Sequence, residues 1–233
     1  MPGDLTVSLP STLNESLSER GYALVPRVLS REQCDQLVAL YRHESRFRSR
    51  IDMARHRFGV GDYKYFARPL PEIVEALRTA LYPPLAVVAN RWNESLGAEE
   101  RYPGTLSEFL ERCASHGQTR PTPLLLHYEE GGYNCLHQDV YGDVAFLLQV
   151  VAFLSRPGVD YTGGEFLLVE QRPRAQSAGE AIVGQQGDLL VFTTRVRPAA
   201  GVRGSYRVNV RHGVSRVRSG TRYTLGIIFH DAR

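Results

Sequence analysis

Residues 128–139 have the sequence YEEGGYNCLHQD. Our predictions of the fold and of the chemistry both start from this stretch. The glycines at 131–132 are typical of a turn between two extended runs. We expect a strand over 134–139. Side chains two residues apart on a strand point to the same face, so the His137 imidazole and the Asp139 carboxylate should converge.

The chain from residue 124 onward has the texture of an all-β protein. Short runs rich in Val, Leu, Ile, Phe and Tyr are separated by Gly, Pro, Asp or Ser, which is typical of strands joined by turns. Eight such runs favour a sandwich or jelly roll over an alternating α/β fold. The expected strands are 124–129, 134–139, 146–155, 165–171, 181–183, 188–194, 206–217 and 222–230.

The first part of the chain is predicted to be mainly helical. Ser30-Arg31-Glu32-Gln33 and Thr105-Leu106-Ser107-Glu108 both have the pattern of a capping box at the start of a helix. An apolar stripe predicts a third helix over 71–96, which Pro83-Pro84 should break or kink.

The composition indicates one globular domain. The length of 233 residues, with 42% hydrophobic and 23% charged residues, is enough for a real core. We expect one compact domain, in which residues 1–123 form a mainly helical N-terminal support with a candidate substrate lid. Residues 124–233 should form the β core.

Several features point to the cytoplasm. The apolar runs are far too short to span a bilayer, and the first residues lack the cationic and apolar regions of a signal peptide. The three cysteines are odd in number and have no C-x-x-C spacing, which disfavours a disulfide framework or a cysteine zinc site. We therefore expect a monomeric cytoplasmic protein with no membrane segment.

The net charge of +3 hides an uneven distribution of charge. Lys64 is the single lysine, so nearly all basic residues are arginines. Basic residues dominate the stretches 42–68 and 171–222. If these stretches meet in space they form a surface that attracts phosphates or carboxylates. The alternative is that the arginines are scattered over a solvated surface.

A third residue would turn the His137–Asp139 pair into a metal site. Two histidines and one carboxylate on one face of a metal form the arrangement of non-haem Fe(II) oxygenases, which leaves positions open for a co-substrate and oxygen. His212, on a later expected strand, is our candidate. His127 and His230 are the alternatives, and the His137–Asp139 pair could also be a simple surface hydrogen bond.

Ten residues after His212 come Arg222 and then Thr224, on one expected strand. Strand alternation puts both on the same face, where a guanidinium beside a hydroxyl can hold a carboxylate by charge-assisted hydrogen bonds. Arg222 could instead be one more surface arginine, but an arginine on an inward face needs an anionic partner.

These motifs in this order resemble the Fe(II)/2-oxoglutarate-dependent dioxygenases. The match includes H-x-D at 137–139, the distal His212 and R-x-T at 222–224. The sequence YTGGEF at 161–166 is similar to the G-G-x-F element of prolyl-hydroxylase-like members, and GDLLVF at 187–192 is similar to the strand before the distal histidine. The resemblance implies a double-stranded β-helix, a cupin-like jelly roll, with the N-terminal helices packed on one sheet.

A narrower resemblance concerns the substrate. Tyr128, nine residues before His137, and the LHQD motif resemble AlkB-type nucleic-acid demethylases. RHGVS at 211–215 and GIIFHD at 226–231 are similar to a bacterial family of oxygenases thought to demethylate damaged DNA oxidatively. The chain departs from AlkB in one respect, because Arg222 follows His212 closely, as in prolyl-hydroxylase-like members.

The resemblance implies an enzyme for DNA repair that uses Fe(II), 2-oxoglutarate and O2. It would demethylate alkylated bases of DNA or other nucleic acid and release succinate, CO2 and formaldehyde. Hydroxylation of a protein side chain or small metabolite is the alternative, and a jelly-roll binding module without a metal is a third reading that the intact ligand set disfavours. The implied metal ligands are His137, Asp139 and His212, and the implied 2-oxoglutarate contacts are Arg222, Thr224, Tyr128 and Asn134.

Other roles remain open for some of these residues. Tyr128 could bond a backbone carbonyl, and Asn134 could only shape the glycine turn. The stretch 47–66 interleaves arginines with aromatic residues, as a lid that stacks on an extruded base would, although residues 63–66 could be a core strand. The loop 171–177 either lines the cavity mouth or is a solvated turn. The candidate substrate contacts are Arg57, Tyr63, Tyr65, Arg172 and Arg174.

Overall fold

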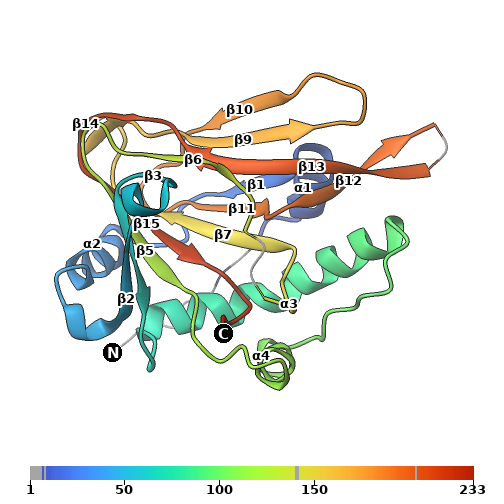
Figure 1. The fold of residues 1–233 in the computed structure, drawn as a ribbon, viewed down its shortest axis with the longest axis horizontal. Coiled ribbons are helices and arrows are strands. Elements are labelled where there is room, and N and C mark those ends of the chain that lie inside the picture. The colour runs from blue at the N-terminus through green and yellow to red at the C-terminus, as the bar shows by residue number, and fades with distance from the viewer. Residues whose placement is uncertain (1–6, 8, 140–141, 203) are drawn as a thin grey trace.

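A computed structural model describes residues 7, 9–139, 142–202 and 204–233. The first six residues, where we expect no signal peptide, and Arg203 of the second basic stretch lie outside the described part. Two antiparallel β-sheets lie face to face, with helices outside one of them (Figure 1). Among the helices described, none is both long and apolar enough to cross a membrane.

The larger sheet has seven strands. They are β1 (Tyr22–Val25), β2 (Phe47–Asp52), β4 (Asp62–Phe66), β5 (Leu124–Tyr128), β7 (Leu148–Phe153), β11 (Leu189–Thr193) and β15 (Arg222–Ile227). Their order across the sheet is β1-β11-β7-β15-β5-β4-β2. The central strands β7, β11 and β15 all come from the part of the chain predicted to be the β core.

The smaller sheet faces it. Its strands are β3 (Gly59–Val60), β6 (Tyr133–His137), β9 (Phe166–Gln171), β10 (Ala178–Ile182), β12 (Val196–Gly201) and β13 (Gly204–Val214). The order is β10-β9-β13-β6-β3, and β12 also pairs with β13. A separate two-stranded ribbon joins β8 (Tyr161–Gly163) to β14 (Val217–Gly220).

All eight strands expected from the sequence are present, with ends that differ by a few residues. The clearest difference is at β6, which ends at His137, so Asp139 follows the strand instead of lying on it. Of the strands after residue 123, β8, β12 and β14 were not expected, and neither were β1, β2 and β3 in the part predicted to be mainly helical. Strands β8, β12 and β14 are short or contain Pro and Gly, which give a weak strand pattern.

The helices are α1 (Leu13–Arg20), α2 (Arg31–Leu40), α3 (Glu72–Ser95) and α4 (Leu106–Ser115), with short 3-10 turns at η1 (Glu44–Arg46) and η2 (Ala54–His56). Both predicted capping boxes are formed, with Ser30 at the start of α2 and Thr105 at the start of α4. Of the break or kink predicted at Pro83-Pro84, the break is wrong, because α3 runs through them without interruption. Each proline lacks a backbone N–H and so costs the helix a hydrogen bond. The burial of the apolar stripe of α3 against the larger sheet stabilises the helix by more than this cost.

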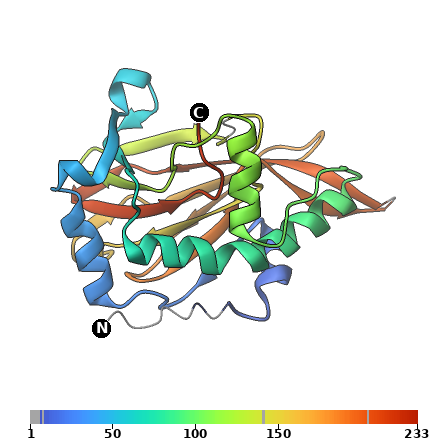
Figure 2. The same cartoon turned by 90° about the horizontal axis from the view of Figure 1, so that it is seen from below.

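The molecule has two main apolar layers. One lies between the helices and the larger sheet, where α3 and α4 cross the sheet (Figure 2). The other lies between the two sheets. Strand β7 serves both layers: Leu148, Val150 and Ala152 belong to the helix side, while Val151 and Phe153 belong to the layer between the sheets. This alternation is the expected property of a central strand covered on both faces.

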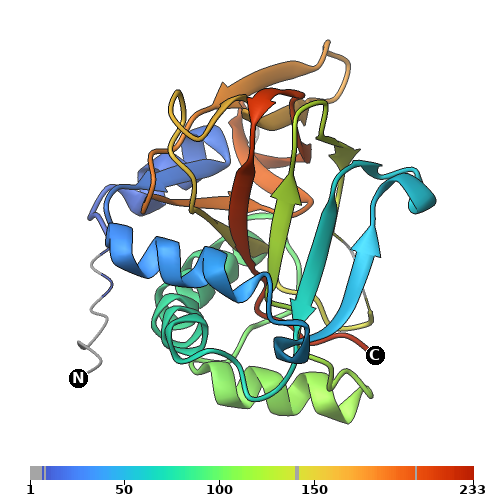
Figure 3. The same ribbon diagram turned by 90° about the vertical axis from the view of Figure 1, so that its left-hand side faces the viewer.

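The N-terminal part also supplies strands to both sheets. β1 is one edge of the larger sheet, β4 and β2 form the other edge, and β3 pairs with β6 in the smaller sheet. The alternative considered for residues 63–66, a strand, is the one observed. The loop between β2 and β3 projects from the body of the molecule (Figures 2 and 3).

Candidate metal and co-substrate site

His137 and His212 are direct partners in the register of β6 and β13. This pairing brings together two side chains that are far apart in the sequence, and Asp139 follows His137 by two residues. One ligand atom from each of the three residues lies within 4.8 Å of the others. The structure thus places the three predicted ligands in one cluster.

The distances within the cluster suit a single cation. His137 Nε2 is 3.4 Å from Asp139 Oδ1, and His212 Nε2 is 3.2 Å from Asp139 Oδ2. The other ring nitrogen of His137, Nδ1, is 2.8 Å from the carbonyl oxygen of Cys135. Because a carbonyl oxygen only accepts, Nδ1 carries the proton in the neutral ring, and the lone pair on Nε2 faces the cluster.

The electrostatics favour a divalent cation. Burial opposes ionisation of Asp139, but the charge of His212 and hydrogen bonds from both histidines hold the pKa of its carboxyl well below the usual value. Burial lowers the pKa of His212, whose ring packs against Phe166 and Phe192. Burial also opposes protonation of His137, but Asp139 outweighs it and raises that pKa. A cation that displaces the proton from His137 would meet a carboxylate and two imidazoles, a donor set that suits Fe(II).

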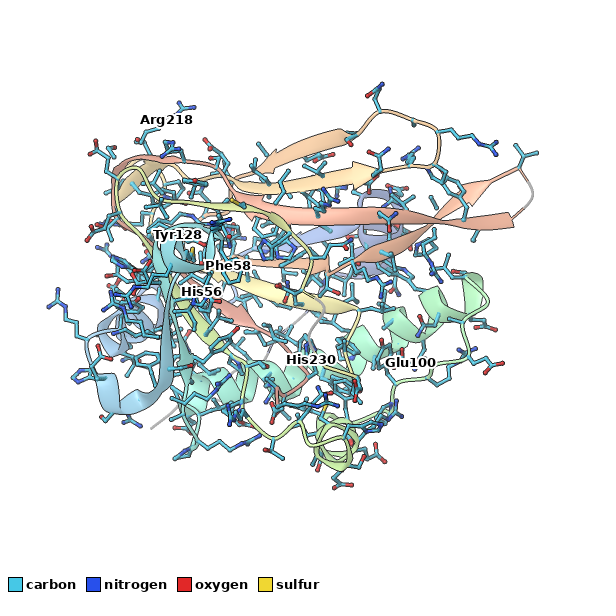
Figure 4. The ribbon with its side chains drawn as sticks, in the orientation of Figure 1. His56, Phe58, Glu100, Tyr128, Arg218 and His230 are labelled. Atoms are coloured by element: carbon cyan, nitrogen blue, oxygen red, sulfur yellow. The ribbon has the colours of Figure 1, made fainter. Side chains whose placement is uncertain are left out.

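The two alternative histidines have other partners. His127 Nδ1 lies 2.9 Å from Asp62 Oδ1, and its ring stacks on Tyr223. His230 is buried, and its Nδ1 accepts a hydrogen bond from the Phe146 backbone. Figure 4 shows His230 on the side of α3, away from Tyr128. Neither histidine belongs to the cluster.

The Arg222 guanidinium is buried without an anionic partner. Its side chain is 1% exposed, and none of its three nitrogens has a hydrogen-bond partner among the described residues. The rings of Tyr128, Phe153 and Tyr161 surround it, with centroids 5.6 to 5.9 Å from the guanidinium carbon. An unpaired buried charge is strongly unfavourable. The position therefore suits an anion that enters from outside, and a dicarboxylate such as 2-oxoglutarate fits this requirement.

One cavity of about 460 Å³ is lined by both the three-residue cluster and Arg222. Thr224 and Asn134 line it as well. Tyr128, which is opposite Arg222 in the register of β5 and β15, is fully buried, and its hydroxyl has no partner among the described residues. Burial raises the pKa of Tyr128, so the phenol is neutral and free to donate. The backbone hydrogen bond that we considered for it is not observed.

Two residues at this site were missed as contributors by the sequence analysis. Gly164 belongs to the YTGGEF element, and a Cβ on it would lie 2.8 Å from Arg222 Cδ, so its lack of a side chain makes room for the arginine. Gln149 donates to Asp139 from the neighbouring strand β7. The sequence could have indicated Gln149 in one way: it is the polar residue on a strand face whose other residues, Val151 and Phe153, are apolar.

Comparison of the sequence with known protein families shows to which family the chain belongs. Residues 61–232, well over half of the chain, match the Oxygenase-NA family, described as an oxygenase catalysing oxidative methylation of damaged DNA. The chain belongs to the Oxygenase-NA family. Proteins from two strains of Mycobacterium tuberculosis, both named as uncharacterized, are 53% identical to this Oxygenase-NA protein over 167 residues, which is 72% of this chain and 72% of theirs.

Solved structures confirm the jelly-roll fold. A prolyl-4-hydroxylase from Pseudomonas putida has a TM-score of 0.58 at 16% identity, with coverage of 95% of this chain and 98% of that one. A member of the 2OG-Fe(II) oxygenase family from Burkholderia pseudomallei has a TM-score of 0.55 at 15% identity, with coverage of 94% and 91%. At such identities the likeness concerns the fold.

The prediction that the protein is an oxidoreductase is confirmed by the family match. By its family this protein is an oxygenase, and therefore an oxidoreductase. The His-Asp-His cluster and the unpaired Arg222 in one cavity agree with this assignment.

The candidate substrate residues separate into two groups. Arg57, Tyr63 and Tyr65 line the cavity. Arg172 and Arg174 lie in the turn between β9 and β10, at the end of the molecule away from Tyr128 (Figures 1 and 4), and are not among the residues that line it.

The second basic stretch does not form one continuous positive surface. Arg197 is buried and paired with Glu170, and Arg222 lies inside the cavity. Arg218, by contrast, points outward (Figure 4).

Proposed function

We propose that this Oxygenase-NA protein oxidatively demethylates alkylated bases in DNA. The main support for oxygenase chemistry is a single cavity. It is lined both by a cluster that can hold a cation and by a buried guanidinium without a partner among the described residues. Support for DNA comes from the family description and from the basic and aromatic residues at the cavity.

We assign the roles as follows. His137, Asp139 and His212 hold Fe(II). Bound Fe(II) and 2-oxoglutarate supply the oxidation of a C–H bond by O2, with succinate and CO2 as the other products. An N-hydroxymethyl base then loses formaldehyde, which restores the unmodified base.

The co-substrate end of the cavity belongs to β5 and β15. The Arg222 guanidinium pairs with the far carboxylate of 2-oxoglutarate, and the hydroxyl groups of Thr224 and Tyr128 supply further hydrogen bonds. Asn134 lies at the same cavity, on β6. A carboxylate in this position neutralises the buried charge of Arg222. The same contact therefore both stabilises bound 2-oxoglutarate and orients it in the cavity.

The loop between β2 and β3 forms one rim of the cavity. Its residue Phe58 is 44% exposed and lines the cavity beside Arg57. The loop is anchored, because Met53 is fully buried and the Cys135 N–H donates to the Phe58 carbonyl at 2.7 Å. Tyr63 and Tyr65 lie deeper, as an edge-to-face pair. Aromatic side chains can stack on an extruded base while Arg57 contacts a phosphate. The positions of Arg172 and Arg174 give no support to a substrate contact.

The test is to incubate the protein with Fe(II), 2-oxoglutarate and methylated single- or double-stranded DNA, and to measure succinate and formaldehyde together. We expect both products in equal amounts, and neither from an Asp139→Ala variant. DNA binding should also weaken steeply as salt is added. Succinate formation that depends on a peptide, amino acid or other small metabolite, with no response to DNA, would overturn the proposal and favour the hydroxylase alternative.

We also propose that the protein acts as a monomer in the cytoplasm. All three cysteines are free, and two of them, Cys34 and Cys113, are buried. Free thiols agree with a reducing compartment. Light scattering of the purified protein would test the monomer.

A further inference from the structure

Gln149 is the polar exception on an apolar strand face. The side of β7 that faces the smaller sheet carries Gln149, Val151 and Phe153, of which the last two belong to the apolar layer between the sheets. Gln149 is only 4% exposed. Burial of an amide is unfavourable unless it is hydrogen-bonded, so a buried glutamine at this place calls for a specific partner.

That partner is the carboxylate of the metal cluster. Gln149 Nε2 lies 2.6 Å from Asp139 Oδ2 and 3.4 Å from His212 Nε2. The amide therefore donates to Oδ2, which also lies 3.2 Å from His212 Nε2, while Oδ1 lies 3.4 Å from His137 Nε2. The two oxygens of Asp139 have different surroundings before any metal binds.

Asp139 needs such an external support. It lies beyond the end of β6, so no strand pairing fixes its backbone. The preceding Gln138 is held by hydrogen bonds to the backbone carbonyls of Arg195 and Val210, but these do not reach the Asp139 side chain. Gln149, on the central strand β7, does reach it.

We propose that Gln149 is a positioning residue that holds Asp139 Oδ2 and so fixes the orientation in which the carboxylate, together with the two histidine nitrogens, faces the metal. A carboxylate held in this way supplies one oxygen to the metal, which keeps positions open for 2-oxoglutarate and O2. The inference rests on the ligand set given under the proposed function. It assigns to Gln149 no contact with substrate.

The test uses Co(II) alone, under argon, as a probe of metal binding and coordination. We expect Gln149→Leu to weaken Co(II) binding by about 10- to 100-fold, the range seen when a residue that orients a metal ligand is lost. At saturating Co(II), the visible absorption bands of the variant should also differ from those of the wild type, since a freed carboxylate can use both oxygens. Both readouts are independent of turnover.

Two further variants separate the possible outcomes. Gln186→Leu removes a side-chain hydrogen bond to a backbone carbonyl away from the cavity and should leave Co(II) affinity and spectrum unchanged. In an Asp139→Ala background, Gln149→Leu should have almost no additional effect, because the glutamine acts through Asp139.

These variants test the proposed metal ligands and the role of Gln149 separately. If Asp139→Ala binds Co(II) as tightly as the wild type, the proposed ligand set is wrong. If Asp139→Ala loses binding while folded Gln149→Leu keeps the wild-type affinity and spectrum, the ligand set stands and the positioning role of Gln149 is refuted. Circular dichroism of each variant without metal establishes that it is folded.

Discussion

At the scale of single residues, the site depends on a charge for which the folded chain provides no partner. Arg222 lies among three aromatic rings, and no described acidic group reaches it. An ion in such surroundings loses its hydration and gains little in return. The protein without ligand therefore carries an energetic cost that an incoming carboxylate removes.

Replacement of Arg222 by leucine should consequently have two opposite effects. The ligand-free protein should become more stable by about 1 to 3 kcal/mol, because an unpaired buried charge is replaced by an apolar group. Binding of 2-oxoglutarate should weaken by at least about 10-fold, since charge-assisted hydrogen bonds are lost. Thermal unfolding with and without 2-oxoglutarate measures both effects. A variant that is less stable than the wild type without ligand would contradict our account of Arg222.

A second residue-scale prediction concerns Gly164, which has φ +64° and lies against Arg222 and Val217. Gly164→Ala should destabilise the protein and also displace the arginine, which weakens 2-oxoglutarate binding. Gly158→Ala is the matched control, because Gly158 has φ +78° but nothing within 4 Å of an added Cβ. It should show only the backbone cost of about 1 kcal/mol. Titration with 2-oxoglutarate, followed by protein stability, distinguishes the two variants; equal affinities would refute the packing role of Gly164.

At the scale of elements, Asp62 on β4 links this strand to the neighbouring strands β2 and β5 and to the end of α2. Its carboxylate accepts hydrogen bonds from Tyr41, which follows α2, from Arg50 on β2 at 2.8 Å and from His127 on β5 at 2.9 Å. This node supports the strands that carry Tyr63, Tyr65 and Tyr128 to the cavity.

The node should make stability depend on pH. Burial alone would raise the pKa of Asp62, but hydrogen bonds from His127 and Tyr41 and the charge of Arg50 hold it at about 2, below the ordinary 3.8. A lowered pKa stabilises the fold above the unfolded value, and this contribution of about 2 kcal/mol is lost as pH falls through the folded value. Asp62→Asn should thus be less stable than the wild type at pH 7, and the difference should shrink below about pH 4.

Urea unfolding of both proteins from pH 7 down to pH 2.5 measures the change. Asp35→Asn removes an exposed carboxylate that is 3.8 Å from Arg31, and serves as a control that should change stability little at any pH. A constant difference between Asp62→Asn and the wild type over the whole range would contradict the assignment.

At the scale of the whole molecule, the N-terminal part and the β core share their apolar layers. Tyr82 of α3 and Phe109 of α4 pack on Phe146 and Phe229 from the second half of the chain. Strands β1 and β4 complete the larger sheet. We therefore propose that residues 1–123 and 124–233 fold together, as the sequence analysis expects of one compact domain.

Chemical unfolding should accordingly show one cooperative transition. Trp92, the single tryptophan, is buried in α3, so its fluorescence reports on the helical layer. Far-ultraviolet circular dichroism reports on the helices and sheets together. The two signals should change at the same denaturant concentration. Separate transitions would show that the N-terminal part unfolds on its own.

The sequence alone determined the eight strands expected after residue 123, the capped helices and the order of the metal and co-substrate residues. These are local properties, because alternation, capping and turn residues act over a few positions. The same limitation explains the errors. The two prolines of α3 conflict with local helix rules, and only the buried contacts of the helix overrule them.

Only the tertiary structure decided which histidine completes the cluster, where the arginines lie and what Gln149 and Gly164 do. The sequence left His127, His212 and His230 as alternatives, and the register of β6 and β13 selects His212. Gln149 meets Asp139, and Gly164 meets Arg222, across pairs of strands that are not neighbours in the chain. Such contacts follow from how two sheets pack face to face, and no periodicity within a single strand encodes them.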